Sequence, residues 1–134
     1  MHELVLRIKK PELCYVFARN AIDRGHPELA TQAYRRAVDL RAEEHNPGTE
    51  AELAALKAFY AYEEALSKVK GKRTRATGTW QMVNRHGVFD TLVKRMNARG
   101  GEDVAPALKE LELEDYSFQA VYAKYPEAFA SVAA

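Results

Sequence analysis

The chain has 134 residues, 47% hydrophobic and 29% charged, which predicts one folded domain over residues 1–134 and excludes a disordered chain. Its 20 lysines and arginines almost balance 19 aspartates and glutamates, so the formal charge of +1 indicates neither a nucleic-acid-binding protein nor an acidic mimic. The single cysteine, Cys14, excludes a disulfide framework, and no apolar run reaches the ~18 residues of a spanning helix, so we expect a cytoplasmic protein with no membrane partner.

The first third of the chain predicts a pair of helices. The first helix covers residues 11–24, from a proline that suits a first turn to a glycine that suits a helix end. Its apolar positions recur every three or four residues and mark one buried face, namely Leu13, Val16, Phe17 and Ala21, with Cys14 close to it. The second helix begins at Pro27 and ends at the Asn-Pro-Gly of residues 46–48.

Small and apolar residues of this pair fall at the spacing of a known repeat. They are Gly25, Ala30, Tyr34, Ala37 and Leu40. Residues 11–44 thereby resemble a single tetratricopeptide repeat. Such repeats need about three copies to bury a shared core, and residues 45–78 do not continue the pattern. The resemblance therefore implies one antiparallel helical hairpin and not a peptide-binding solenoid.

A long central helix is predicted next, from Thr49 to about Val69. Thr49 and Glu52 form a capping box, and Gly71 ends the helix inside a basic loop. Its apolar stripe consists of Leu56, Phe59, Tyr62, Leu66 and Val69.

Shorter helices fill the rest of the chain. They cover residues 79–85, 88–98, 103–111 and 115–124, followed by a last turn at 126–132, with Gly87 between the first two and Asp103 and Asp115 as caps. Only residues 3–8 carry a weak strand pattern, which we discount. We expect an all-α fold, a compact bundle of about seven helices.

Residues 79–98 show the spacing of a further known motif. Met82 faces inward, Gly87 occupies the turn, and three apolar residues pack back from the second helix: Val88, Val93 and Met96. The pair resembles a helix-turn-helix, although Val83 and His86 depart from that motif. The resemblance implies that the outer face of the second helix enters a major groove with Asp90, Thr91, Lys94 and Arg95.

Charge is unevenly distributed along the chain. Residues 68–99 hold nine basic residues and one acid, a net charge of +8, whereas residues 1–67 and 100–134 carry −2 and −5. Such a segment can bind an anionic partner. Alternatively, the acidic C-terminal segment folds back and pairs with it.

The basic loop within this segment, residues 70–78, has the composition of a phosphate-binding surface. Its cations, hydroxyls and glycines can contact phosphates, although the spacing is not that of a P-loop. Trp80 follows the loop, where it either stacks on an unpaired base or is buried in the core. The predicted nucleic-acid-binding residues are Lys70, Lys72, Arg73, Arg75, Trp80, Arg85, Thr91, Lys94, Arg95 and Arg99.

The stretch KRTRATGTWQMVNRHG, residues 72–87, resembles a block found in small bacterial proteins of unassigned function. That resemblance implies no activity.

The sequence offers little for catalysis. The four histidines are scattered without metal-ligand spacing. Glu63 and Glu64 are adjacent and point in different directions, so one of them is expected to be a solvated surface charge. We expect no catalytic residues, no metal site, no cofactor and no enzymatic activity.

The C-terminal segment leaves a second function open. Its aromatic and apolar residues fall largely on one helical face, which is either core or a surface for a protein partner: Tyr116, Phe118, Val121, Tyr122, Tyr125 and Phe129. The sequence thus favours a small nucleic-acid-binding or regulatory protein that contacts DNA or RNA. The alternative is a helical protein-interaction module with no nucleic-acid role, whose hairpin or aromatic tail contacts a partner.

Overall fold

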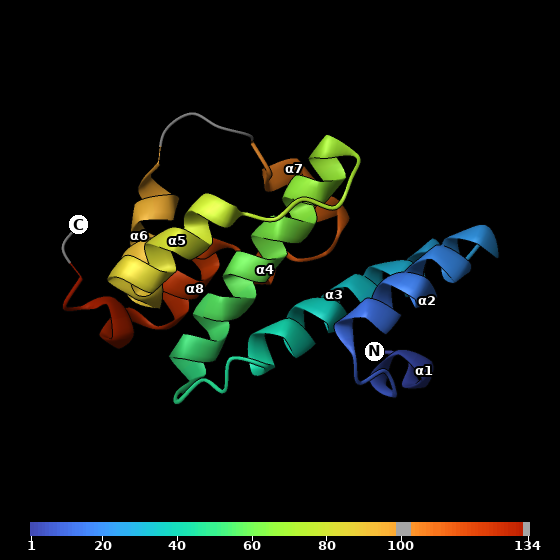
Figure 1. Ribbon diagram of the computed structural model, residues 1–134, viewed down its shortest axis with the longest axis horizontal. Helices are drawn as coiled ribbons and strands as arrows, with labels where there is room; N and C mark the ends of the chain where they lie inside the picture. Colours follow the sequence, from blue (N-terminus) through green and yellow to red (C-terminus); the bar gives the residue numbers. More distant parts are fainter. Residues whose placement is uncertain (99–102, 133–134) are drawn as a thin grey trace. The chain divides into compact units, whose positions relative to one another are not determined.

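The computed structural model describes residues 1–98 and 103–132, and all regular elements in those ranges are helical (Figure 1). The all-α prediction is confirmed. The chain divides into two compact units, residues 1–46 and 47–134, and its organisation as one domain stays a prediction. No helix in the described ranges has both the length and the apolar character needed to cross a membrane.

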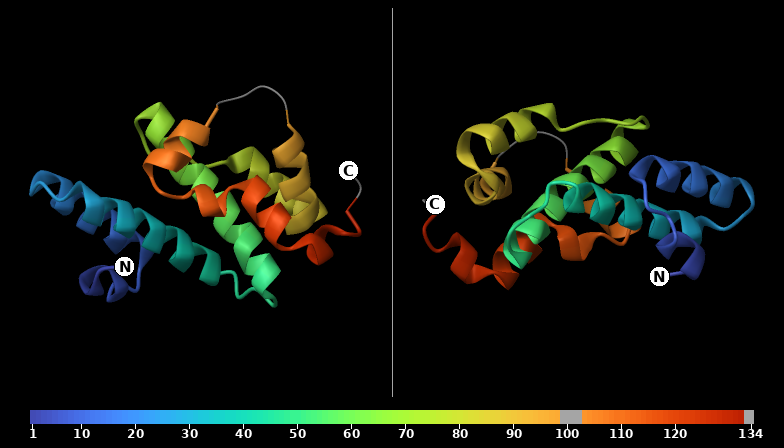
Figure 2. Two further views of the ribbon diagram at one scale, coloured as in Figure 1. Left: turned by 180° about the vertical axis from the view of Figure 1, so that it is seen from behind. Right: turned by 60° about the horizontal axis from the view of Figure 1, so that its bottom comes forward.

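The N-terminal unit is a helical hairpin preceded by one short turn of helix. It contains α1 (Glu3–Leu6), α2 (Pro11–Asp23) and α3 (Pro27–Glu43), and both views of Figure 2 show α2 and α3 side by side. Gly25, with φ +81°, takes the left-handed conformation between them. Residues 3–6 are helical, so discounting the strand pattern was correct.

Small side chains form the interior of this hairpin. They are Cys14, Ala18, Ala21, Ala30, Ala33 and Ala37, joined by Leu40. The prediction that Leu13 and Val16 lie on the buried face of α2 is wrong, because they are 50% and 56% exposed. The helix turns its smaller residues inward, since alanines allow two helix backbones to approach closely.

The C-terminal unit is built around α4 (Glu50–Lys70). Helices α6 (Val88–Asn97), α7 (Ala105–Glu110) and α8 (Phe118–Lys124) pack against it, and α5 (Thr77–His86) packs on α6. Two short 3₁₀ turns, η1 (Glu114–Tyr116) and η2 (Pro126–Phe129), flank α8. Thr49 Oγ1 accepts the Glu52 backbone N–H at 3.1 Å, which confirms the predicted start of α4.

Aromatic side chains fill the core of this unit. Phe59 is fully buried, and its ring centroid lies 5.6 Å from that of Trp80 and 5.8 Å from that of Phe118. Most of the C-terminal aromatic stripe joins the same core, with Val121 and Phe129 buried. The stripe therefore serves as core, and Tyr122, 41% exposed, is its most accessible large side chain.

Several predicted helix boundaries shift in the structure, and α7 begins at Ala105, later than the predicted start at residue 103. Helix α5 begins two residues early, at Thr77. Asp115 does not cap the helix assigned to residues 115–124, because Ser117 Oγ accepts the Ala120 N–H at 3.1 Å and the helix begins at Phe118. The helix starts where its apolar face begins, and the acidic residues before it form η1.

Candidate functional site

Three buried polar side chains of α4 hold the basic loop in place. Glu63, Glu64 and Ser67 are 5%, 5% and 7% exposed, and all three face residues 73–80. The prediction that one of the two glutamates is a solvated surface charge is wrong. Both carboxylates can be buried because the loop and α5 supply donors to them.

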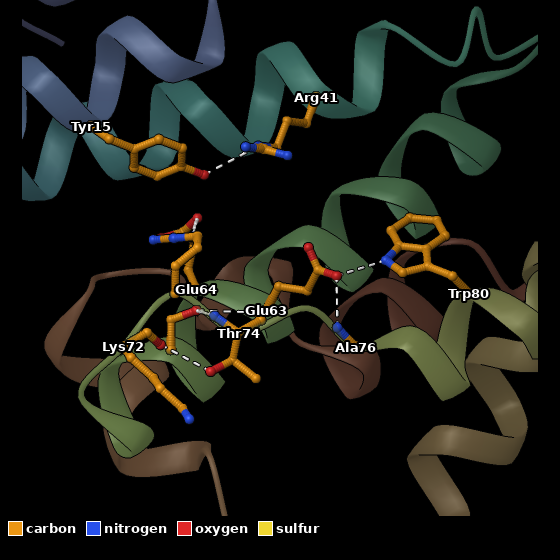
Figure 3. Close-up of polar contacts among 10 residues, drawn as sticks. Tyr15, Arg41, Glu63, Glu64, Lys72, Thr74, Ala76 and Trp80 are labelled. Carbon is orange, nitrogen blue, oxygen red and sulfur yellow. Dashed lines mark hydrogen bonds and ion pairs between the residues drawn. The ribbon is translucent and has the colours of Figure 1, made fainter.

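Glu63 anchors the start of α5. Its Oε2 accepts the Ala76 backbone N–H at 2.8 Å and the Trp80 indole Nε1–H at 2.7 Å, and Figure 3 shows the carboxylate reaching both. The Trp80 ring, half-buried, also lies 4.8 Å from the Tyr60 ring, centroid to centroid. Trp80 is therefore a core side chain with its indole nitrogen engaged.

Glu64 and Ser67 fix the loop before it. The Arg73 guanidinium donates to both Glu64 carboxylate oxygens, at 2.7 and 2.9 Å. Ser67 Oγ accepts the Thr74 N–H at 2.9 Å and donates to the Thr74 carbonyl at 3.3 Å. Arg73, predicted to contact phosphate, is thus occupied by a carboxylate in a bidentate pair.

The left-handed Gly71, with φ +70°, lets the chain turn into this loop. The Lys72 N–H donates to the Ser67 carbonyl at 3.2 Å, and the Gly71 N–H donates to the Lys68 carbonyl at 3.3 Å. These two bonds form a Schellman motif, which closes the end of α4.

The structure separates the predicted cations into groups. Lys72, Arg75, Arg85 and Lys94 are exposed, and none of them pairs with an acid of the described chain. Lys70 is exposed and has contacts of its own, and the neighbouring Lys68 pairs with Glu110 at 3.3 Å. Arg99 lies outside the described residues. The Lys68–Glu110 pair shows the acidic segment reaching the edge of the basic segment.

Helix α6 presents a smaller outer face than the helix-turn-helix resemblance implies. Asp90 and Lys94 are exposed as predicted, whereas Thr91 is 0% exposed, so its predicted place on the outer face is wrong. The helix packs against α4, α5 and α8, and these contacts bury more than one of its faces. The Thr91 hydroxyl has no hydrogen-bond partner in the described chain.

Arg95 turns away from that outer face. It is half-buried, its guanidinium carbon lies 5.2 Å from the centroid of the Tyr62 ring, and Nη2 donates to Tyr62 Oη at 2.8 Å. Both side chains line a pocket of about 660 Å³. The sequence did not reveal this pocket, because its walls come from α4, α6, α7 and the segment leading into α8.

Within the described ranges, no three histidine, cysteine, aspartate or glutamate side chains lie together as a metal site would require. No protein-family model, curated protein or solved structure matches this chain.

Proposed function

We propose that this protein binds the phosphate backbone of a nucleic acid through the loop before α5 and the α5–α6 pair. The supporting observation is the set of exposed cations Lys72, Arg75, Arg85 and Lys94, which pair with no described acid. Cations left without acidic partners are available to phosphates, whose counterions they would release.

The start of α5 is suited to the same ligand. Apart from Glu63, which accepts the N–H of Ala76 just before the helix, no described side chain caps α5, and Thr77 and Gly78 are exposed in its first turn. A Cβ atom built on Gly78 would meet nothing within 4 Å, so a phosphate has room to approach the backbone there. The first N–H groups of a helix and its dipole both favour an anion.

The test is a fluorescence-anisotropy titration with labelled duplex and single-stranded DNA and RNA at two salt concentrations. Four contacts on duplex DNA predict a log–log salt slope of about −3.6. Replacing Lys72 and Arg75 with alanine should weaken binding and reduce the size of that slope by about 2. Arg73 is left intact, because its loss would release Glu64 and disturb the loop.

A matched control removes the same charge elsewhere. Lys9 and Arg19 are exposed in the N-terminal unit, and their double alanine variant should bind with an unchanged slope. Equal losses in the two double variants, or no binding even at low salt, would rule out the loop as the phosphate site.

Gly78→Ala gives a more local test. Gly78 has no strained backbone conformation and open space at its Cβ, so alanine should stabilise the helix by up to about 1 kcal/mol. If phosphate contacts this turn, the same variant should bind more weakly while unfolding at a higher temperature.

The protein-interaction alternative is favoured by a different observation. Exposed large apolar side chains concentrate on α1 and α2, where Leu4, Leu13, Val16 and Ile22 are each at least 50% exposed. Such side chains contribute to protein interfaces. Under this alternative, Leu13→Ser with Val16→Ser abolishes co-purification of a protein partner, and Lys72→Ala with Arg75→Ala leaves it unchanged.

A further inference from the structure

The pocket beside Arg95 has the size and the lining of a small-molecule site. Its volume of about 660 Å³ lies within the range of ligand-binding pockets. Of the described residues, one cation, Arg95, and two carboxylates, Asp103 and Glu114, line it together with aromatic and apolar side chains. We propose that it binds a small molecule in which a single carboxylate is attached to a flat, apolar body.

Arg95 is the group that would hold the carboxylate. One of its N–H donors is used by Tyr62, and its Nε is buried with no partner in the described chain. Neither Asp103 nor Glu114 forms an ion pair with it, although both line the same pocket. A half-buried guanidinium without a counter-charge is unfavourable, and a carboxylate can accept two parallel N–H bonds from its planar fork.

The walls near Arg95 suit a flat apolar body. Tyr62 and Phe118 both line the pocket, with ring centroids 5.6 Å apart and ring planes inclined by 34°. Met96 and Val104 add apolar surface to the lining. Aromatic rings bind other rings well in offset or tilted arrangements, and Met adapts to the shape that it contacts.

The two carboxylates limit the charge of the ligand. Among the described residues of the lining, Asp103 and Glu114 outnumber the one cation, Arg95, and both carboxylate side chains are exposed. A ligand with one negative charge can be held by Arg95, whereas a doubly charged phosphate would be repelled. The proposal for this pocket therefore does not depend on the nucleic-acid surface proposed above.

The test compares three probes by isothermal titration calorimetry: 2-naphthoate, its uncharged analogue 2-naphthamide, and adenosine monophosphate. We expect 2-naphthoate to bind and the other two to bind at least about tenfold more weakly. Arg95→Gln should weaken naphthoate binding by about tenfold to a hundredfold, because a charge-assisted hydrogen-bond pair is lost. Arg19→Gln is the matched control, since Arg19 is exposed in the N-terminal unit and does not line the pocket, and it should leave binding unchanged.

A second variant tests the pocket without altering Arg95. Ala105 is an exposed lining residue at the start of α7, so Ala105→Leu fills the pocket from a position outside the core. It should abolish naphthoate binding while the circular-dichroism spectrum stays unchanged. Four results would each overturn the proposal. They are equal affinity for 2-naphthamide, tighter binding of adenosine monophosphate, unchanged naphthoate affinity in either pocket variant, and no naphthoate binding at about 10 mM.

Discussion

Each of the two units of this protein has a different kind of interior. The N-terminal hairpin packs alanines and one cysteine between α2 and α3, and it leaves several large apolar side chains exposed. The C-terminal unit buries Phe59 among other aromatic rings and also buries Glu63 and Glu64. The first unit depends on close approach of two backbones, and the second depends on aromatic volume and on satisfied polar groups.

This difference is tested most strongly at Phe59. Phe59→Ala removes a fully buried ring that contacts Trp80 and Phe118, and we expect the free energy of unfolding to fall by about 4 kcal/mol. Urea unfolding followed by circular dichroism measures the change. A loss below about 1 kcal/mol would show that the C-terminal unit does not depend on this aromatic cluster.

The buried polar groups of the C-terminal unit are tested at Glu63. Glu63→Ala leaves the Ala76 N–H and the Trp80 indole N–H without an acceptor, so stability should fall by about 3 kcal/mol and Trp80 emission should shift. Glu63→Gln keeps one acceptor oxygen of the same size and should cost about 1 kcal/mol. Equal losses for the two variants would mean that these hydrogen bonds are not what stabilises the start of α5.

The stability of the hairpin should fall when side-chain volume is added to its interior, and should change little when an exposed side chain is shortened. Ala37 is fully buried between α2 and α3, so Ala37→Leu forces the helices apart and should destabilise by about 2 kcal/mol. Leu13→Ala, at a position that is 50% exposed, should change stability by less than about 0.5 kcal/mol. If Leu13→Ala proved the more damaging of the two, the interior assigned to the hairpin would be wrong.

The same contrast explains which features of the fold could be predicted from the sequence. Proline and glycine mark the ends of α2 and α3, and the Thr49 cap marks the start of α4, because these signals act on the local backbone. The buried face of α2 was misassigned because periodicity favours large apolar residues, whereas this hairpin selects small ones.

The contacts of the candidate site were harder to predict from the sequence, because they join distant parts of the chain. Glu63 meets Trp80 from 17 residues away, and Tyr62 meets Arg95 from 33 residues away. The exposed cations Lys72 and Lys94 could be named from composition alone. Which cations are paired, and where a pocket forms, depends on how the helices pack.

Thr91 gives a small effect and the finest distinction within the C-terminal unit. Its hydroxyl is buried without a partner in the described chain, in contrast to the side chains of Glu63, Glu64 and Ser67, each of which forms hydrogen bonds. Thr91→Val keeps the shape of the side chain and removes the unpaired hydroxyl, so the free energy of unfolding should rise by about 1 kcal/mol. Nucleic-acid affinity should stay unchanged, because a side chain with no exposed surface cannot contact a base. A Thr91→Val variant that lost stability would instead indicate that this hydroxyl has a partner, and one that lost nucleic-acid binding would place Thr91 back on the recognition surface.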